Sequence, residues 1–205
     1  MLNIEETKMS AEEQAKRKND LVKNGFIQAA KNIILAEGVT AVSVRKIALE
    51  TGYSYATIYH YFADLNALLL AVKENMVEDV AAHLMAEDEA PFHSVEDLKQ
   101  VNRSYVQYYL DRPHVYYFFY SYRFKTEEDP LYDLRFQQGW FAAYDAFVQN
   151  GLLRSEDVVT AAKTMIYVIQ GLLALYFSSN GLTKDAFFQE LDNAADYLFQ
   201  NRREI

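Results

Sequence analysis

The sequence predicts an all-α protein with about nine helices. Apolar residues recur three and four positions apart along most of the 205-residue chain, and no segment alternates polar and apolar residues as a strand does. Only 7 glycines and 3 prolines interrupt the chain, which favours long regular elements. Hydrophobic residues make up 51% of the sequence, which is enough to form a buried core.

Three helices are predicted before residue 63. Each begins at a capping residue or ends at a glycine where the apolar period starts or stops, as helix boundaries commonly do. The predicted helices span residues 16–37 ending at Gly38, 44–51 after Ser43, and 55–62 after Ser54. Residues 1–15 are expected to form a flexible tail, so the first domain comprises residues 16–62.

Six more helices are predicted in residues 63–205, which we expect to form a second domain. Asp64 is the expected cap of the first of them, and Ser94 with Asp97 is an acidic variant of the capping box. Pro113 and Pro130 suit helix starts. The predicted ranges are 65–86, 95–111, 115–124, 130–150, 155–179 and 183–201, with a loop over 87–93.

The composition excludes several kinds of site and location. Without cysteine the chain has no disulfide, thiolate zinc site, iron-sulfur cluster or cysteine nucleophile. The first residues are acidic where a secretory signal would be basic and then apolar, and no run of about 18 uninterrupted apolar residues occurs. A cytoplasmic protein with no membrane partner is therefore expected.

The charge is divided unevenly along the chain. A net charge of −9 argues, taken alone, against nucleic-acid binding, because Lys and Arg supply most of the non-specific affinity for phosphate. Residues 1–62, however, hold 8 Lys and Arg against 7 Asp and Glu, whereas the rest of the chain holds 12 against 22. The first domain is thus close to neutral, and an acidic second domain is expected to orient it toward DNA.

The second and third predicted helices have the spacing of a helix-turn-helix. Ala48 is small where the helices cross, and Gly52 permits a positive φ at the turn. Tyr53, Ile58 and Tyr61 are expected to hold the third helix against the core. The positions left exposed for a DNA major groove are Tyr55, Ala56, Thr57, Tyr59 and His60. On spacing alone, a tight helical hairpin inside a bundle is the alternative interpretation.

A set of short motifs accompanies this spacing. They are Ala29-Ala30, Ile33-Ile34, Glu37-Gly38, Ser43, Ile47-Ala48, Gly52-Tyr53-Ser54, Ile58-Tyr59-His60-Tyr61-Phe62 and Leu68-Leu69. Over about residues 16–75 the chain thereby resembles the TetR family of bacterial transcriptional regulators. The resemblance implies a homodimer that binds a palindromic operator in double-stranded DNA through a helix-turn-helix domain. It also implies a C-terminal domain that binds a small-molecule effector and forms the dimer.

The resemblance also implies roles for individual residues. Ser43, Tyr59 and His60 correspond to phosphate-contacting positions, and Tyr55, Ala56 and Thr57 to the groove-facing segment. Arg45, Lys46 and Ser54 complete the expected DNA-binding set. Two positions that are often basic in the family are Tyr55 and Leu65 here, so moderate affinity with a shallow salt dependence is expected. His60 as a buried, satisfied histidine is the alternative.

Aromatic residues crowd the middle of the second domain. Sixteen Tyr, Phe and Trp residues lie between Tyr105 and Phe147, and many tyrosine hydroxyls there would need partners. The alternative is ordinary core packing. The expected ligand-pocket residues are Tyr105, Tyr109, Phe119, Arg123, Trp140 and Tyr167. The expected ligand is a small hydrophobic or aromatic molecule.

The last two predicted helices are apolar on more than one face, which suggests a four-helix interface between two copies. The expected interface residues are Ile166, Ile169, Leu173, Phe177, Leu191 and Ala195. A monomer core is the alternative.

The most different alternative is a helical-bundle enzyme. Asp79, His83 and Glu87 lie at i, i+4 and i+8 and could be mistaken for metal ligands, but no His has Glu three residues before it. The chain also lacks a Gly-rich phosphate loop and a Ser elbow. We therefore expect no catalytic residues, cofactor or metal, and a ligand-responsive repressor. An architectural or activating DNA binder of the same fold stays open.

Overall fold

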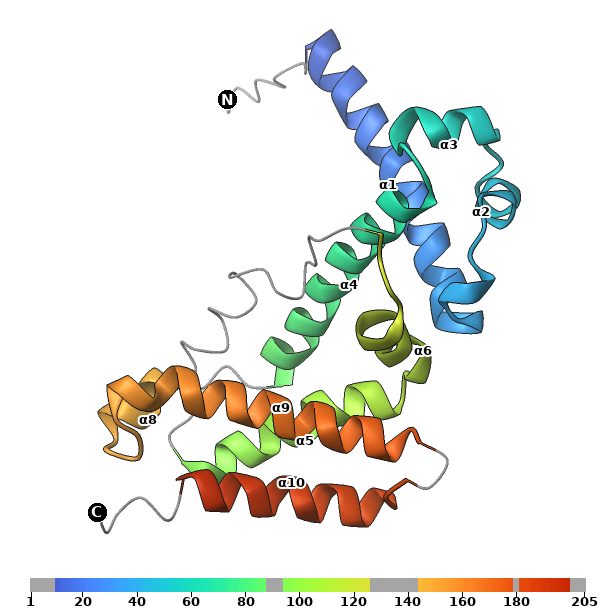
Figure 1. Ribbon diagram of the computed structural model, residues 1–205. Helices are drawn as coiled ribbons and strands as arrows, with labels where there is room; N and C mark the ends of the chain where they lie inside the picture. Colours follow the sequence, from blue (N-terminus) through green and yellow to red (C-terminus); the bar gives the residue numbers. More distant parts are fainter. Residues whose placement is uncertain (1–9, 88–93, 126–143, 179–180, 200–205) are drawn as a thin grey trace, which may run out of the picture.

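The computed structural model describes residues 10–87, 94–125, 144–178 and 181–199. Within these ranges it contains nine α-helices and no strand, which confirms the predicted all-α class. Three N-terminal helices form a head, and the long helix α4 runs from it to a second group of helices (Figure 1).

The head consists of α1 (Ala11–Glu37), α2 (Val44–Thr51) and α3 (Tyr55–Tyr61). Helix α1 begins five residues before its predicted start. The Ser10 hydroxyl accepts a hydrogen bond from the Glu13 N–H at 3.1 Å, and the Glu13 carboxylate accepts one from the Ser10 N–H at 2.7 Å. This capping box starts the helix within the segment that we expected to be a flexible tail.

One side of each head helix is buried in a common core. Helix α1 contributes apolar residues three and four apart, and α2 and α3 close over them. The buried residues are Phe26, Ala29, Ala30, Ile33, Ile34, Val39, Val42, Ile47, Ala48, Ile58 and Phe62. The same core continues along α4 through Leu68, Leu69 and Val72, so the head is joined to α4 by packing as well as by the chain.

Helix α4 (Leu65–Glu87) begins where the Asp64 carboxylate accepts a hydrogen bond from the Ala67 N–H at 2.8 Å. Lys31 of α1 pairs with Asp79 of α4, and its ammonium donates to the Asn75 side chain at 2.9 Å. Asp79 is therefore paired across the two helices and only partly exposed. The His83 ring likewise lies 5.2 Å from the Tyr108 ring.

The second group contains α5 (Val95–Leu110), α6 (Pro113–Tyr116), α8 (Asp145–Gln149), α9 (Val158–Tyr176) and α10 (Lys184–Phe199). Helices α9 and α10 lie side by side and antiparallel, and α5 packs against α10 (Figure 1). Helices α9 and α10 begin and end one to three residues inside their predicted ranges, whereas α5 begins at its predicted residue and ends one residue early. Of the helix predicted over 130–150, only the last turn, α8, lies within the described residues.

The helix predicted over 115–124 differs in the structure. It starts earlier, at Pro113, and after one α-helical turn it widens into a π-helical turn, η2 (Tyr117–Ser121). The turn closes with a hydrogen bond from the Tyr122 N–H to the Tyr117 carbonyl at 2.9 Å, five residues back. A π turn changes the period at which side chains recur. Apolar residues spaced three and four apart therefore do not predict where this helix ends.

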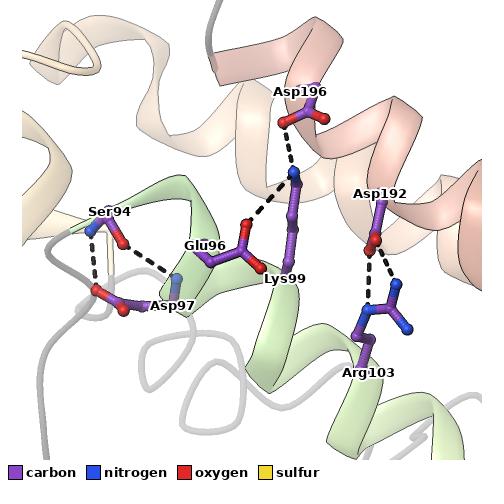
Figure 2. A network of polar contacts seen from close by, with 7 residues as sticks. All are labelled: Ser94, Glu96, Asp97, Lys99, Arg103, Asp192 and Asp196. Atoms are coloured by element: carbon purple, nitrogen blue, oxygen red, sulfur yellow. Dashed lines mark hydrogen bonds and ion pairs between the residues drawn. The ribbon is translucent and has the colours of Figure 1, made fainter.

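Ion pairs join α5 to α10 along their polar edge (Figure 2). The Lys99 ammonium lies 2.7 Å from Asp196 and 3.6 Å from Glu96, and Arg103 makes a two-bond pair with Asp192. The hydrogen bond to Asp196 raises the pKa of Lys99. These pairs complement the apolar contacts between the two helices.

Helix α9 leaves much of its apolar surface uncovered. In the segment Ser155–Tyr176, which contains α9, the most apolar 18-residue window has a mean hydropathy of 1.7, and 28% of that window is buried. By length and composition alone it would suit a membrane span, as the core helices of many soluble proteins also do. The exposed side carries Tyr167, which is 69% exposed, and Leu175.

Candidate nucleic-acid interface

The turn between α2 and α3 has the geometry of a helix-turn-helix. Gly52 ends α2 in the left-handed region at φ 74° and ψ 7°, and its N–H donates to the Ala48 carbonyl at 2.9 Å. A residue with a Cβ is strained in this region, which explains the glycine. Ile47, Ala48 and Ile58 are buried between the two helices and α1.

Ser54 starts α3. Its hydroxyl accepts a hydrogen bond from the Thr57 N–H at 3.1 Å and lies 2.8 Å from the Thr57 hydroxyl. Ser43 starts α2 in the same way, since its hydroxyl accepts from the Lys46 N–H at 3.3 Å. Both helices therefore begin at capping serines. The residues at the start of α3, Ser54, Tyr55 and Ala56, are exposed to solvent.

Ser54→Ala is expected to lower the free energy of unfolding by about 1 kcal/mol, because the Thr57 N–H loses the capping hydroxyl and keeps only the Ser54 carbonyl as acceptor. Urea denaturation followed by circular dichroism measures the change. Ser121→Ala is the control, since Ser121 is exposed and lies outside the head. Equal stability of Ser54→Ala and wild type would show that the cap contributes nothing.

The exposed surface of α3, which we call the recognition face, consists of Tyr55, Ala56, Tyr59 and His60. Tyr55 and Tyr59 are 50% and 52% exposed and lie one helical turn apart, as do Ala56 and His60. The recognition face therefore presents two phenol hydroxyls, an imidazole and one small residue along one side of α3. Thr57 lies at its edge, half-buried.

The opposite side of α3 is held firmly. The Tyr61 ring lies 5.7 Å from the Phe26 ring, and its hydroxyl donates to the Asn19 side chain at 2.5 Å. His60 is exposed, with its ring edge-on to Tyr61 at 5.3 Å, so the alternative of a buried histidine is wrong. The recognition face is thus carried by a helix that cannot rotate freely.

The basic residues in the middle of the head differ in their surroundings. Arg45 is exposed, but the Lys46 ammonium lies 2.6 Å from the Glu37 carboxylate, and Lys31 is engaged by α4. Of the two basic residues in the expected DNA-binding set, Lys46 is therefore partly neutralised.

Tyr53 is a further candidate for contact with DNA, although the sequence pattern predicted only a core position for it. Its ring packs on Phe26 at 5.3 Å, yet the residue is 42% exposed directly before the Ser54 cap. The residue type could have indicated this exposure, because a tyrosine at a core position has a hydroxyl that must reach solvent or a hydrogen-bond partner.

The expected pocket residues do not all come together. Tyr105, Tyr109 and Phe119 are buried, with ring centroids 5.1 Å apart for Tyr105 and Tyr109 and 6.1 Å for Tyr109 and Phe119. Arg123 and Tyr167 are exposed, so Tyr167 lies on the outer side of α9 and not in this cluster. Trp140 lies outside the described residues.

The expected interface residues need correction. Ile169, Leu173, Leu191 and Ala195 are buried within the chain itself, because α9 and α10 use that stripe to pack on each other and on the core. Ile166 is half-buried, and Phe177 stacks on the Tyr116 ring at 4.7 Å. The apolar residues left exposed on the two helices are Val159, Tyr167, Leu175, Phe177 and Tyr197.

Comparison with known proteins agrees with this arrangement. Residues 26–72 match the family model described as bacterial regulatory proteins, tetR family. This range contains most of the head and the start of α4. No curated protein sequence matches the chain.

Solved structures share the fold over nearly the whole chain. A TetR transcriptional regulator from Rhodococcus sp. RHA1 is 15% identical, with 91% of this chain and 99% of that chain covered and a TM-score of 0.60. RolR, solved in complex with the ligand resorcinol, is 18% identical, with 89% of each chain covered and a TM-score of 0.65. AibR, solved in complex with isovaleryl coenzyme A and operator DNA, is 18% identical, with 86% and 97% covered and a TM-score of 0.59.

Proposed function

Because the N-terminal domain of this chain is that of the TetR family of bacterial regulatory proteins, and the whole chain has the fold of TetR-family regulators, we propose that it is a ligand-released repressor. It binds a palindromic operator as a homodimer and leaves it when a small hydrophobic or aromatic ligand binds the second domain. In this proposal residues 16–62 bind DNA, and residues 63–205 bind the ligand and form the dimer.

The recognition face is the observation that carries this proposal. Tyr55 and Tyr59 expose their phenol groups from a helix whose other side is fixed by Ile58 and Tyr61. A helix of this kind can enter a major groove, with the Thr57 methyl or hydroxyl at a base edge and with Tyr59, His60 and Ser43 at phosphates. Because Lys46 is paired with Glu37, affinity is moderate and depends weakly on salt.

Dimerisation through α9 and α10 explains their uncovered apolar surface. Tyr167 and Leu175 on α9 and Tyr197 on α10 are exposed together with the small residues Gly171 and Ala174. Small residues allow the backbones of two helices to approach closely, and an isologous pair would bury both copies of this surface. The two heads would then read half-sites about 34–36 Å apart, one turn of DNA.

Ligand binding can reach the head through two contacts. The His114 ring of α6 lies against Gly38 at the end of α1, where a Cβ would be only 3.1 Å from the His114 Nδ1. Lys73 of α4 donates to the Phe119 carbonyl of η2 at 3.2 Å. A ligand that moves α6 and η2 would therefore shift both α1 and α4, and with them the spacing of the heads. RolR and AibR, with ligands in their structures, support a ligand-binding second domain.

Sequencing the genomic DNA fragments that the protein binds provides the operator and tests the proposed role. One or a few palindromic sites at promoters support a local regulator, and reporter expression that rises when the protein is removed identifies a repressor. Many dispersed sites would indicate an architectural protein, and expression that falls would indicate an activator.

With that operator, Tyr59→Phe and His60→Ala are each expected to weaken binding about tenfold, because each removes a phosphate hydrogen bond. A gel shift at fixed salt measures the affinity, and thermal unfolding is expected to stay unchanged since both residues are exposed. Tyr117→Phe, on an exposed tyrosine outside the head, is the control. Wild-type affinity in both head variants would remove these two residues from the DNA contact.

A further inference from the structure

Two residues of α5, Asn102 and Tyr109, carry buried polar atoms with no partner, and together with Tyr105 they form what we call the α5 polar face. Asn102, Tyr105 and Tyr109 lie at positions i, i+3 and i+7, so they project from one side of the helix. Both amide atoms of Asn102 and the hydroxyl of Tyr109 are buried without a hydrogen bond. Among the described residues, the Gln170 amide nitrogen is the only other buried side-chain atom in this condition.

Unpaired polar atoms of this kind are unfavourable in a folded protein. A buried donor or acceptor without a partner loses its hydrogen bonds to water and forms none within the protein to replace them. Three such atoms on one helix face therefore indicate an occupant that supplies the missing hydrogen bonds. Asn102 offers two donors and an acceptor, and Tyr109 offers one donor that can also accept.

The surroundings of these atoms are aromatic. The Tyr109 ring meets the rings of Tyr105, Phe119 and Tyr120 edge-on at 5.1, 6.1 and 5.6 Å. The hydroxyls of Tyr105 and Tyr120 are 2.7 Å apart and so are already paired with each other. An occupant with an aromatic ring would continue this edge-to-face packing.

The surroundings also disfavour a charged occupant. Burial raises the pKa of Tyr105 and of Tyr109 well above the usual value, so both phenols stay neutral. The Lys73 ammonium, the buried cation nearest to Phe119, is already engaged by the Phe119 carbonyl at 3.2 Å and the Phe124 ring at 4.8 Å. A net charge on the occupant would therefore be poorly compensated.

We propose that Asn102 and Tyr109 bind the polar groups of an uncharged, single-ring aromatic ligand with hydroxyl or carbonyl substituents. The two residues are separated by about 10 Å along the helix axis, and helical side chains lean toward the N-terminus, which brings the Tyr109 hydroxyl back toward Asn102. A single ring with a polar group at each end would offer one partner to each residue. That this ligand is the effector rests on the proposed function, whereas its binding does not.

Isothermal titration calorimetry without DNA tests the proposal with three molecules of similar shape: hydroquinone kept free of oxygen, p-xylene and 4-hydroxybenzoate. Hydroquinone is expected to bind, and Asn102→Leu and Tyr109→Phe are each expected to weaken it about tenfold. Tyr108→Phe is the matched control, because Tyr108 points to the His83 ring on another side of α5. Equal binding of p-xylene, tighter binding of 4-hydroxybenzoate, or no binding of hydroquinone would each overturn the proposal.

The melting temperature of the ligand-free protein gives a second readout. Asn102→Leu is expected to raise it, because leucine has the same branched shape and removes two unpaired polar atoms. A lower melting temperature would show that the amide is satisfied in the ligand-free protein, and would overturn the proposal. If a compound released the operator equally well from wild type and Asn102→Leu, the ligand site would be elsewhere while the proposed function stood. Failure of wild type to bind any operator would overturn only the proposed function.

Discussion

Tyr167→Glu is expected to leave the protein monomeric and to weaken operator binding by about a hundredfold or more. Tyr167 is the most exposed apolar residue of α9, at the middle of the surface that we propose as the dimer interface. In an isologous interface each substitution acts twice, so two carboxylates would be placed in one apolar contact. A monomer binds DNA through one head only. It therefore lacks the additional affinity that a dimer gains because its second head is tethered close to the second half-site.

The experiment compares oligomeric state and DNA affinity in the same samples. Analytical ultracentrifugation measures the mass, and the gel shift measures affinity for the full palindrome and for a half-site. Half-site affinity is expected to be unchanged, since Tyr167 belongs to α9, which lies in the second group of helices and away from the recognition helix α3 (Figure 1). Tyr117→Glu is the matched control on an exposed tyrosine of η2. A Tyr167→Glu protein that remained dimeric would exclude this side of α9 from the interface.

Lys73→Ala is expected to lower the free energy of unfolding by about 2–4 kcal/mol. Lys73 is fully buried, which is unusual for a lysine, and its ammonium contacts the Phe119 carbonyl and the Phe124 ring. Truncation removes the packing of the long side chain and leaves the Phe119 carbonyl without this donor. The substitution therefore loosens the junction between α4 and η2.

Chemical denaturation measures the loss, and two further variants separate its causes. Lys73→Met keeps most of the volume and is expected to lose less stability than Lys73→Ala. Lys18→Ala, at an exposed site on α1, is expected to change stability by less than about 0.5 kcal/mol. If Lys73→Ala were as stable as Lys18→Ala, the buried contacts of Lys73 would contribute nothing to the junction.

The head was the part of the protein most open to prediction. Its start and stop signals act within a few residues: Ser43 and Ser54 cap the helices that follow them, and Gly52 takes a conformation that other residues adopt at a cost. The exposure of Tyr55, Tyr59 and His60 followed from the same periodicity. Their contacts with DNA stay a proposal.

The second group of helices was predicted less completely. Helix α5 was placed to within one residue because Ser94 and Asp97 form a capping box. The π turn after α6 was missed, since it depends on how Phe118 and Phe119 pack and not on a local signal. Four of the expected interface residues, Ile169, Leu173, Leu191 and Ala195, are instead buried within the chain.

Sequence alone determined the fold class, the helix-turn-helix and the family resemblance, because caps, turn glycines and helical periodicity act over short distances along the chain. Only the tertiary structure decided which apolar stripe of α9 is covered, that Lys73 is buried, and that Asn102 and Tyr109 lack partners. These properties depend on neighbours brought from distant segments. Periodicity identifies a residue that can be buried, but it does not identify what lies against it.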